Sequence, residues 1–149
     1  MRSASIDANV LVAQLTWQPD AVVLDALDHG IVLEFVVTAQ ALAPGMFGLR
    51  AAQTQQRHVQ LRYFPLTRQY QVQVVEDART RSYAARALAL AAIEDLHLPL
   101  AAWHQGAIAY RVCVALDRDA LPGALRLPAL FAAAWRIDSG DYTWRARAG

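Results

Sequence analysis

Apolar and polar residues alternate with a period of two in several segments of the chain, which is the pattern of half-buried β-strands. The clearest segment is residues 31–42, and the same alternation marks residues 10–17 and 107–116. One face of the first strand would carry Ile31, Leu33, Phe35, Val37 and Ala39. In residues 107–116, the inward-facing side chains would be Ile108, Tyr110, Val112, Val114 and Leu116. We therefore predict three strands that each bury one face.

Two further alternating runs, residues 59–63 and 70–74, lie on either side of the sequence Phe-Pro-Leu-Thr-Arg-Gln. A short connection that contains proline, between two such runs, predicts a β-hairpin. Pro65 would preset the turn, and Tyr63 and Tyr70 would point to the core. Thr67 and Arg68 are then turn residues, and the alternative, that they hold a ligand or partner, stays open.

Two segments carry helix signals. Residues 20–30 begin with Asp20, a good N-cap, and end with Gly30, which suits the left-handed position after a helix. Residues 84–96 are rich in alanine and leucine and are followed by Pro99, so they predict the second helix. In the tail, Pro122 and Pro128 exclude a long helix, and a strand-rich ending is expected there.

These elements predict an α+β fold in one domain spanning residues 1–149. Neighbouring strands with short links are usually antiparallel. The expected architecture is a mainly antiparallel curved sheet or β-sandwich of about six to seven strands with two helices.

Composition narrows the class of protein. The chain is 56% hydrophobic and 18% charged, which argues against disorder. Its formal net charge of +1 gives no field for collecting nucleic acid, so no nucleic-acid partner is expected. No apolar run reaches the roughly 18 residues that cross a bilayer, so no direct membrane insertion is expected. The first 17 residues do not form an export signal as they stand. The protein is then cytoplasmic, or the sequence is a mature form whose leader has been replaced.

Candidate chemistry is sparse. The chain contains none of the common nucleotide-binding, serine-hydrolase or zinc motifs, so we expect no enzyme, no cofactor and no metal. Cys113 lies in an apolar run and should behave as a small hydrophobe. Asp95, His97 and His104 are a weak candidate for catalysis or metal binding that lacks a clear further ligand; histidines that favour a helix end explain them better.

Two other polar groups have simpler explanations. Ser139, between Asp138 and Asp141, lacks a histidine base and reads as turn chemistry. Asp117 and Asp119 begin like a calcium loop, but the glycine that such a loop requires is missing, so a solvent-exposed loop is the better interpretation.

The tryptophans are more suggestive, because indoles often line ligand grooves and interfaces. Trp135 and Trp144 each precede an arginine and would suit a peptide- or sugar-binding surface. The alternative is that they close the ends of the sheet. Trp103 joins these two as a candidate binding residue.

Several motifs in this order resemble a proteobacterial family known as domain of unknown function 4390. They are LDALDHGIVLEFVV, LRYFPLTRQYQV, SYAARALALAAIEDL and the closing LPGALRLPAL segment with its W-x-I-x-S-G-D-Y-T-W ending. The resemblance runs from Val10 to Trp144. It implies an exported protein of the periplasm, in a family that has no assigned activity and no catalytic residues to carry over. It also implies a gene that often neighbours a membrane sensor kinase of a two-component system.

Three functions remain in view. The first is a non-enzymatic periplasmic accessory or protein-binding module that engages a membrane sensor. The second is a small-ligand binder with a pocket between helix 84–96 and the sheet, near Trp103 and Tyr110. The third is an enzyme of unrecognised type that uses Asp95, His97 and His104.

Overall fold

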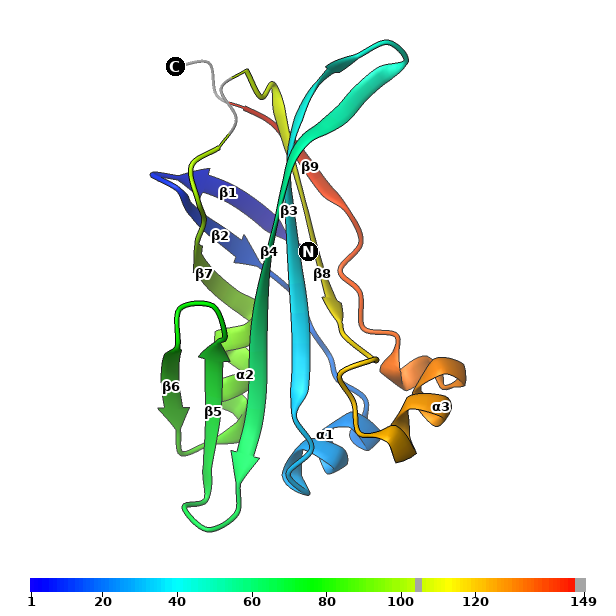
Figure 1. Ribbon diagram of the computed structural model, residues 1–149. Coiled ribbons are helices and arrows are strands. Elements are labelled where there is room, and N and C mark those ends of the chain that lie inside the picture. The colour runs from blue at the N-terminus through cyan, green and yellow to red at the C-terminus, as the bar shows by residue number, and fades with distance from the viewer. Residues whose placement is uncertain (104–105, 147–149) are drawn as a thin grey trace.

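Two antiparallel sheets make up most of the fold in the computed structural model, which describes residues 1–103 and 106–146 (Figure 1). The smaller sheet has the order β1-β2-β7, with bounds Ser3–Asp7, Val10–Gln14 and Asp95–Pro99. The larger has the order β6-β5-β4-β3-β8-β9. Its strands, in that order, are Arg79–Tyr83, Gln69–Val74, Gly48–Phe64, Leu33–Gly45, Ala109–Leu116 and Tyr142–Arg145. The α+β class is thus confirmed.

Three α-helices and one 3₁₀ turn join these strands within the described ranges. They are α1 (Ala21–Asp28), α2 (Arg86–Glu94), α3 (Gly123–Phe131) and η1 (Ala133–Trp135). The signals for α1 are confirmed. The Asp20 carboxylate accepts a hydrogen bond from the Val22 N–H at 2.9 Å, and Gly30 has φ +86° just past the helix end.

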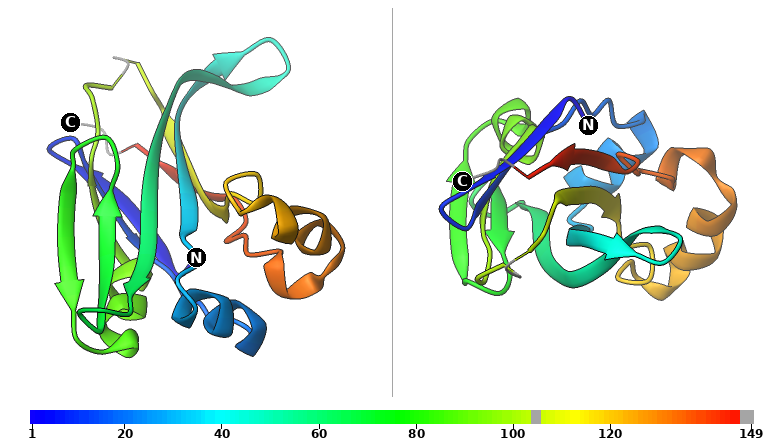
Figure 2. Two further views of the ribbon diagram at one scale, coloured as in Figure 1. Left: turned by 60° about the horizontal axis from the view of Figure 1, so that its bottom comes forward. Right: turned by 90° about the horizontal axis from the view of Figure 1, so that it is seen from above.

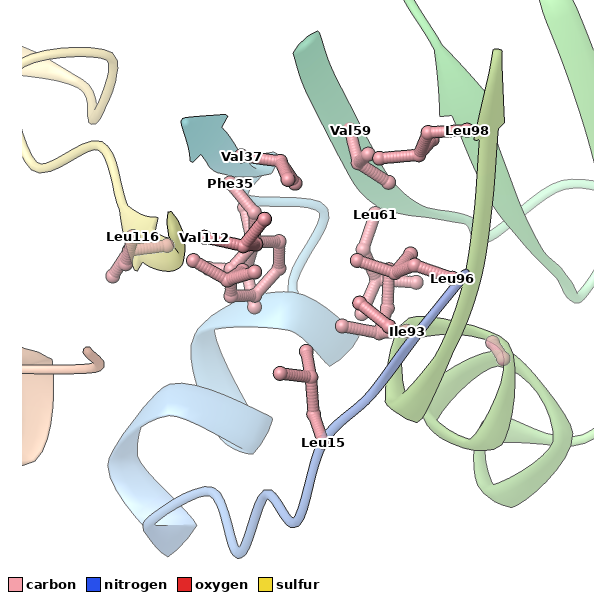
Figure 3. Close-up of a cluster of buried hydrophobic side chains, with 14 of the residues drawn as sticks. Leu15, Phe35, Val37, Val59, Leu61, Ile93, Leu96, Leu98, Val112 and Leu116 are labelled. Atoms are coloured by element: carbon pink, nitrogen blue, oxygen red, sulfur yellow. The ribbon is translucent and has the colours of Figure 1, made fainter. Parts of the chain in front are cut away.

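The core lies between the two sheets. Phe35 and Val37 of β3 and Val59 and Leu61 of β4 are buried, as the alternation predicts. They meet Leu96 and Leu98 of β7 and Ile93 of α2 from the other side (Figure 3). The small sheet and α2 therefore cover one face of the large sheet, and the apolar side chains of both layers interdigitate there.

The other face of the large sheet is polar. Gln60 donates to the Glu34 carboxylate at 2.6 Å, and Gln56 donates to Thr38 at 3.4 Å. Cross-strand pairs of this kind suit a solvated face, which is the other half of the alternation read from the sequence.

Three strands of the structure, β1, β6 and β7, were not predicted. The helix expected over residues 84–96 ends at Glu94, and β7 begins at the next residue. Because His97 lies in this strand, its interpretation as a helix-end histidine is wrong. β1 and β6 were missed because both are short edge strands with largely exposed polar residues.

The tail is helical rather than strand-rich. α3 spans nine residues and contains Pro128 at its sixth position. Pro128 has no N–H to donate, yet the helix continues, and the Ala132 N–H bonds to the Pro128 carbonyl at 2.9 Å. Ile108 is the other correction, since it precedes β8 and is 46% exposed rather than buried.

Candidate partner-binding site

The hairpin of β3 and β4 extends far beyond the rest of the large sheet. β8 pairs with β3 only from Phe35 to Leu42, whereas β3 and β4 stay paired as far as Gly45 and Gly48. Residues 43–50 therefore form a two-stranded arm, which projects from the top of the molecule in Figure 1 and again in Figure 2. An isolated two-stranded ribbon is only marginally stable in water. The stability of the fold therefore does not explain why β3 and β4 extend beyond the sheet.

A β-bulge marks the base of the arm. Ala41 pairs with Gln53, but the next residue, Leu42, pairs with Ala51, so Ala52 is an extra residue in β4. A bulge bends its strand and increases the local twist. The arm therefore leaves the sheet at a built-in change of direction.

The tip of the arm is apolar and fully exposed. Met46 is 91% exposed and Phe47 is 99% exposed, with Leu49 behind them at 49%. The turn depends on glycine: a Cβ on Gly45 would lie 3.0 Å from the Gly48 carbonyl oxygen, and Gly48 itself has φ +122°. Arg50 is the one charged residue within 43–50. The backbone thus presents two large apolar side chains where water surrounds them.

Below the arm, side chains of β4 hold the segment that follows β7. The Gln55 amide accepts from the Ala101 N–H at 2.8 Å and donates to the Ala101 carbonyl at 3.1 Å. Gln53 donates to the Ala102 carbonyl, and Arg57 donates to the Pro99 carbonyl. Val59 and Leu61 lie on this same face of β4, against the core. The face becomes polar at residues 53–57 because the main-chain N–H and C=O groups of residues 99–102 lie against it and need hydrogen-bond partners.

Four aromatic rings gather at the same end of the sheet. Trp103 meets Tyr110 edge-on with ring centroids 5.5 Å apart, and Tyr110 lies 5.6 Å from Trp144. Tyr142 continues the row at 5.9 Å. Within the described residues, the buried Trp103 Nε1 has no hydrogen-bond partner. Because Tyr110 pairs with Ala41, this aromatic cluster sits beside the base of the arm.

The structure thus brings two of the candidate residues, Trp103 and Trp144, together. It separates them from Trp135, which is only 3% exposed and packs in the core near Leu116, at the opposite end of β8. Trp135 therefore cannot share a surface with Trp144. Its role is to close the core.

Thr67 and Arg68 lie at the far end of β4, in the turn of the predicted β4–β5 hairpin, which is confirmed. Both are exposed, beside Leu66 at 101% exposure, and Arg68 has φ +52°. Tyr63 and Tyr70 pair across this hairpin and pack against the core. Figure 1 shows this turn at the bottom of the molecule, opposite the arm.

The polar groups near Ser139 are engaged in holding main chain. Ser139 Oγ accepts from the Val114 N–H at 2.9 Å and donates to the Gly140 carbonyl at 2.9 Å. Asp138 accepts from the Gly140 N–H at 2.6 Å and from the Cys113 thiol at 3.4 Å. Burial, followed by the Asp138 contact, raises the pKa of Cys113 to about 11, so the thiol is protonated near neutral pH.

Two of the three residues considered for catalysis lie together on β7: His97 Nε2 is 3.4 Å from Asp95 Oδ1, and both side chains are more than half exposed. His104 lies outside the described residues. Within residues 1–103 and 106–146, no group of three or more His, Cys, Asp or Glu side chains is placed to hold a metal ion.

Two hollows accompany these features. One of about 420 Å³ lies between residues 15–20 and 133–139, with Trp17 on its wall. The other, of about 510 Å³, lies between α2 and the sheet; Trp103 and Tyr110 do not line it. No helix in the described part of the chain is both long and apolar enough to cross a bilayer.

The fold and its surfaces define an α+β protein of two packed antiparallel sheets with a projecting hairpin arm. A family model described as a domain of unknown function, DUF4390, matches residues 3–145, so the chain belongs to that family, as its motifs indicated. Comparison with curated proteins and with solved structures finds no match.

Met46 and Phe47 were not among the predicted site residues, because residues 43–48, Ala-Pro-Gly-Met-Phe-Gly, have the glycines and proline of a turn. A signal was present: two adjacent large apolar residues are not what an exposed turn requires.

Proposed function

We propose that this protein is a non-enzymatic accessory module that binds a partner protein through the tip of its arm. The partner would be the periplasmic part of a membrane two-component sensor. The observation that carries the proposal is the exposure of Met46 and Phe47 at the end of a projecting hairpin.

Burial of these two side chains would stabilise a complex. A large apolar side chain gains about 1.5–3 kcal/mol when it is fully removed from water. Aromatic residues and methionine are enriched at the centres of protein interfaces. The arm presents them ahead of the molecule, where a concave partner surface can surround them.

The base of the arm supplies the rigidity that such a contact needs. Gln53 and Gln55 hold the main chain of residues 101–102 by hydrogen bonds. Trp103 and Trp144 both contact the ring of Tyr110, which lies at the base of the arm. An ordered base lowers the entropy lost when the arm is immobilised on binding.

The periplasmic location and the sensor partner rest on the family resemblance. The non-catalytic assignment is supported by the engagement of Ser139 Oγ with main chain and by the raised pKa of Cys113. Both groups are held in roles that do not supply a nucleophile.

The test is a binding assay between this protein and the periplasmic segment of a membrane sensor kinase from the same organism, of the kind that the family resemblance implies. Met46→Ser with Phe47→Ser should weaken binding at least tenfold. The matched control is Leu66→Ser, an equally exposed apolar residue in the turn at the other end of β4, which should bind like the wild type.

Absence of binding by the wild type at roughly 50 µM would overturn the sensor partner. Equal binding by the double variant would overturn the role of the arm. Vesicles of phosphatidylglycerol and phosphatidylethanolamine are tested in parallel. If they bind the wild type and not the double variant, the tip contacts lipid and the protein partner is wrong.

A further inference from the structure

The free edge of β7 borders the 510 Å³ hollow, hereafter the groove. The groove lies between α2, β7 and the inward face of β5 and β6. Its apolar surface comes from Val72 and Val74 of β5, Leu88 of α2, and Leu96 and Leu98 of β7. Its volume falls in the usual range of about 300–1,000 Å³ for binding sites.

The hydrogen bonds at both ends of β7 show which main-chain groups face outward. Leu15 N–H bonds to the Glu94 carbonyl at 2.7 Å, and Leu100 N–H bonds to the Asn9 carbonyl at 2.7 Å. In an antiparallel ladder, bonded and non-bonded residues alternate. Residues 96 and 98 therefore bond to β2, whereas the N–H and C=O of Asp95 and His97, and the C=O of Pro99, point to the free edge.

Two of these outward residues already have partners. The Asp95 N–H bonds to the Ala91 carbonyl at the end of α2, and the Pro99 carbonyl accepts from Arg57 at 2.8 Å. The N–H and C=O of His97 lie between them. The middle of β7 is thus a short strand edge that faces an open groove.

The charge of the groove is positive. Arg79 and Arg81 of β6 pair in register with Val74 and Val72 of β5, so their side chains lie on the inward face of the sheet, over the groove. Among the described residues, neither guanidinium has a carboxylate within salt-bridge distance. Asp95 is the one carboxylate among the described residues that line the groove, so two arginines there face one acidic group.

We propose that the groove binds an extended peptide segment of a partner protein, which pairs as an added strand with the free edge of β7 and places acidic side chains against Arg79 and Arg81. Addition of a strand to an exposed edge is a common mode of peptide recognition, in which main-chain bonds give affinity and side-chain pockets give specificity. Alternate side chains of the peptide would enter the apolar part of the groove. This site does not depend on the arm and goes beyond the function proposed for it.

The test uses a capped, fluorescently labelled heptapeptide in which valine and glutamate alternate, titrated against the whole protein by fluorescence anisotropy. Two changes to the peptide separate the contribution of main-chain hydrogen bonds from that of charge. N-methylation of alternate residues removes main-chain donors, and lysine in place of glutamate reverses the charge. Each change should weaken binding at least tenfold, because it removes either the main-chain hydrogen bonds or the charge-assisted hydrogen bonds of the peptide.

The protein variants test the same terms. Arg79→Gln with Arg81→Gln should weaken binding of the glutamate peptide about tenfold or more, while Arg62→Gln, on the opposite face of the sheet, should leave it unchanged. His97→Pro removes the outward N–H without touching the bonds to β2 and should also weaken binding. If this variant does not fold, the N-methylated peptide makes the same test on the wild type.

No binding at roughly 1 mM, or equal binding of the N-methylated or lysine peptides, would overturn the proposal. Binding of dodecanoate that the glutamate peptide cannot displace would also overturn it, and would assign the groove to a small anionic amphiphile. Met46→Ser with Phe47→Ser should bind the peptide normally, so failure of the arm hypothesis and failure of this one give different results.

Discussion

The side-chain amide of Gln55 pairs with both main-chain groups of Ala101, as a residue of a neighbouring strand would. Its oxygen accepts from the N–H at 2.8 Å and its nitrogen donates to the carbonyl at 3.1 Å. One side chain thus extends the hydrogen bonding of β4 to a segment that has left the small sheet.

Gln55→Glu tests this pairing. The carboxylate keeps the acceptor but loses the donor and faces the Ala101 carbonyl, so the free energy of unfolding should fall by about 1 kcal/mol. Gln56→Glu, one residue along on the solvated face, loses only the long 3.4 Å bond to Thr38 and should change it by less than about 0.5 kcal/mol. Urea unfolding monitored by circular dichroism measures both. Equal losses in the two variants would contradict the structural role of Gln55.

Tyr70 joins three elements by bonding to a shared carboxylate. Its hydroxyl donates to Asp28 at the end of α1 at 2.8 Å, and Arg86 of α2 pairs with the other oxygen of the same carboxylate. Burial, followed by the bond to Asp28, raises the pKa of Tyr70 to about 12. Since the folded state holds this proton more tightly than the unfolded state, the contribution is present below pH 10 and is lost as pH rises towards 12.

Absorbance at 295 nm should therefore show one tyrosine that titrates near pH 12, and Tyr70→Phe should remove that step. The same variant should cost about 1 kcal/mol of stability at pH 7. A titration in which Tyr70→Phe leaves the late step in place would show that another tyrosine carries it.

Glu76 makes stability depend on acid pH. Its carboxylate accepts from the His58 N–H at 3.0 Å and contacts His58 Nδ1 at 2.5 Å. Partial burial opposes the shift, but these hydrogen bonds hold the pKa of Glu76 below its ordinary value of 4.5. The contribution is present above pH 4.5 and is lost as pH falls through the lowered pKa.

Urea midpoints measured between pH 7 and pH 3 should decline less steeply in Glu76→Gln than in the wild type over the acid end of this range. Asp77→Asn, in the same exposed turn, is the matched control and should follow the wild-type curve. Parallel curves for wild type and Glu76→Gln would show that the pair does not contribute.

Two phenylalanines of the β3–β4 hairpin should respond oppositely to substitution. Phe47 is 99% exposed, so Phe47→Ser should change the free energy of unfolding by less than about 0.5 kcal/mol. Phe35 is 2% exposed and packs edge-on against Trp17 at 5.1 Å, so Phe35→Ala should cost about 3–5 kcal/mol. A large loss for Phe47→Ser would mean that the arm tip serves folding and not contact.

Arg68 is strained in its turn. An L-residue at φ +52° costs about 1–2 kcal/mol, part of which glycine recovers, so Arg68→Gly should raise stability by up to about 1 kcal/mol. Thr67→Gly, where φ is negative, should instead lower it slightly. If Arg68→Gly is destabilising, the arginine side chain holds the turn and the backbone explanation is wrong.

Alternation along the chain predicted the strands that bury a face, because burial of one side forces the period of two at Phe35, Val59 and Val112. It did not predict β6, whose exposed Arg79 and Arg81 carry no such constraint. It also hid β7, because Leu96 and Leu98 continue the apolar composition of α2 without a break.

The candidate site was harder to predict, because its meaning lies in what surrounds it. Met46 and Phe47 are apolar residues in a turn, and only the end of the β8 pairing at Leu42 shows that, among the described strands, β3 and β4 continue beyond their neighbours there. Trp103 and Trp144 were identified as aromatic residues of interest, but only the structure places them beside the arm, Trp144 by its pairing with Tyr110 and Trp103 by its ring contact with Tyr110.

The length of β4 has a mechanical consequence. At about 3.3 Å per residue, its 17 residues span up to roughly 55 Å, from the turn at Phe47 to the turn at Leu66. The two turns are therefore held several nanometres apart, and a force applied at the arm would be transmitted along a single continuous strand to the opposite turn.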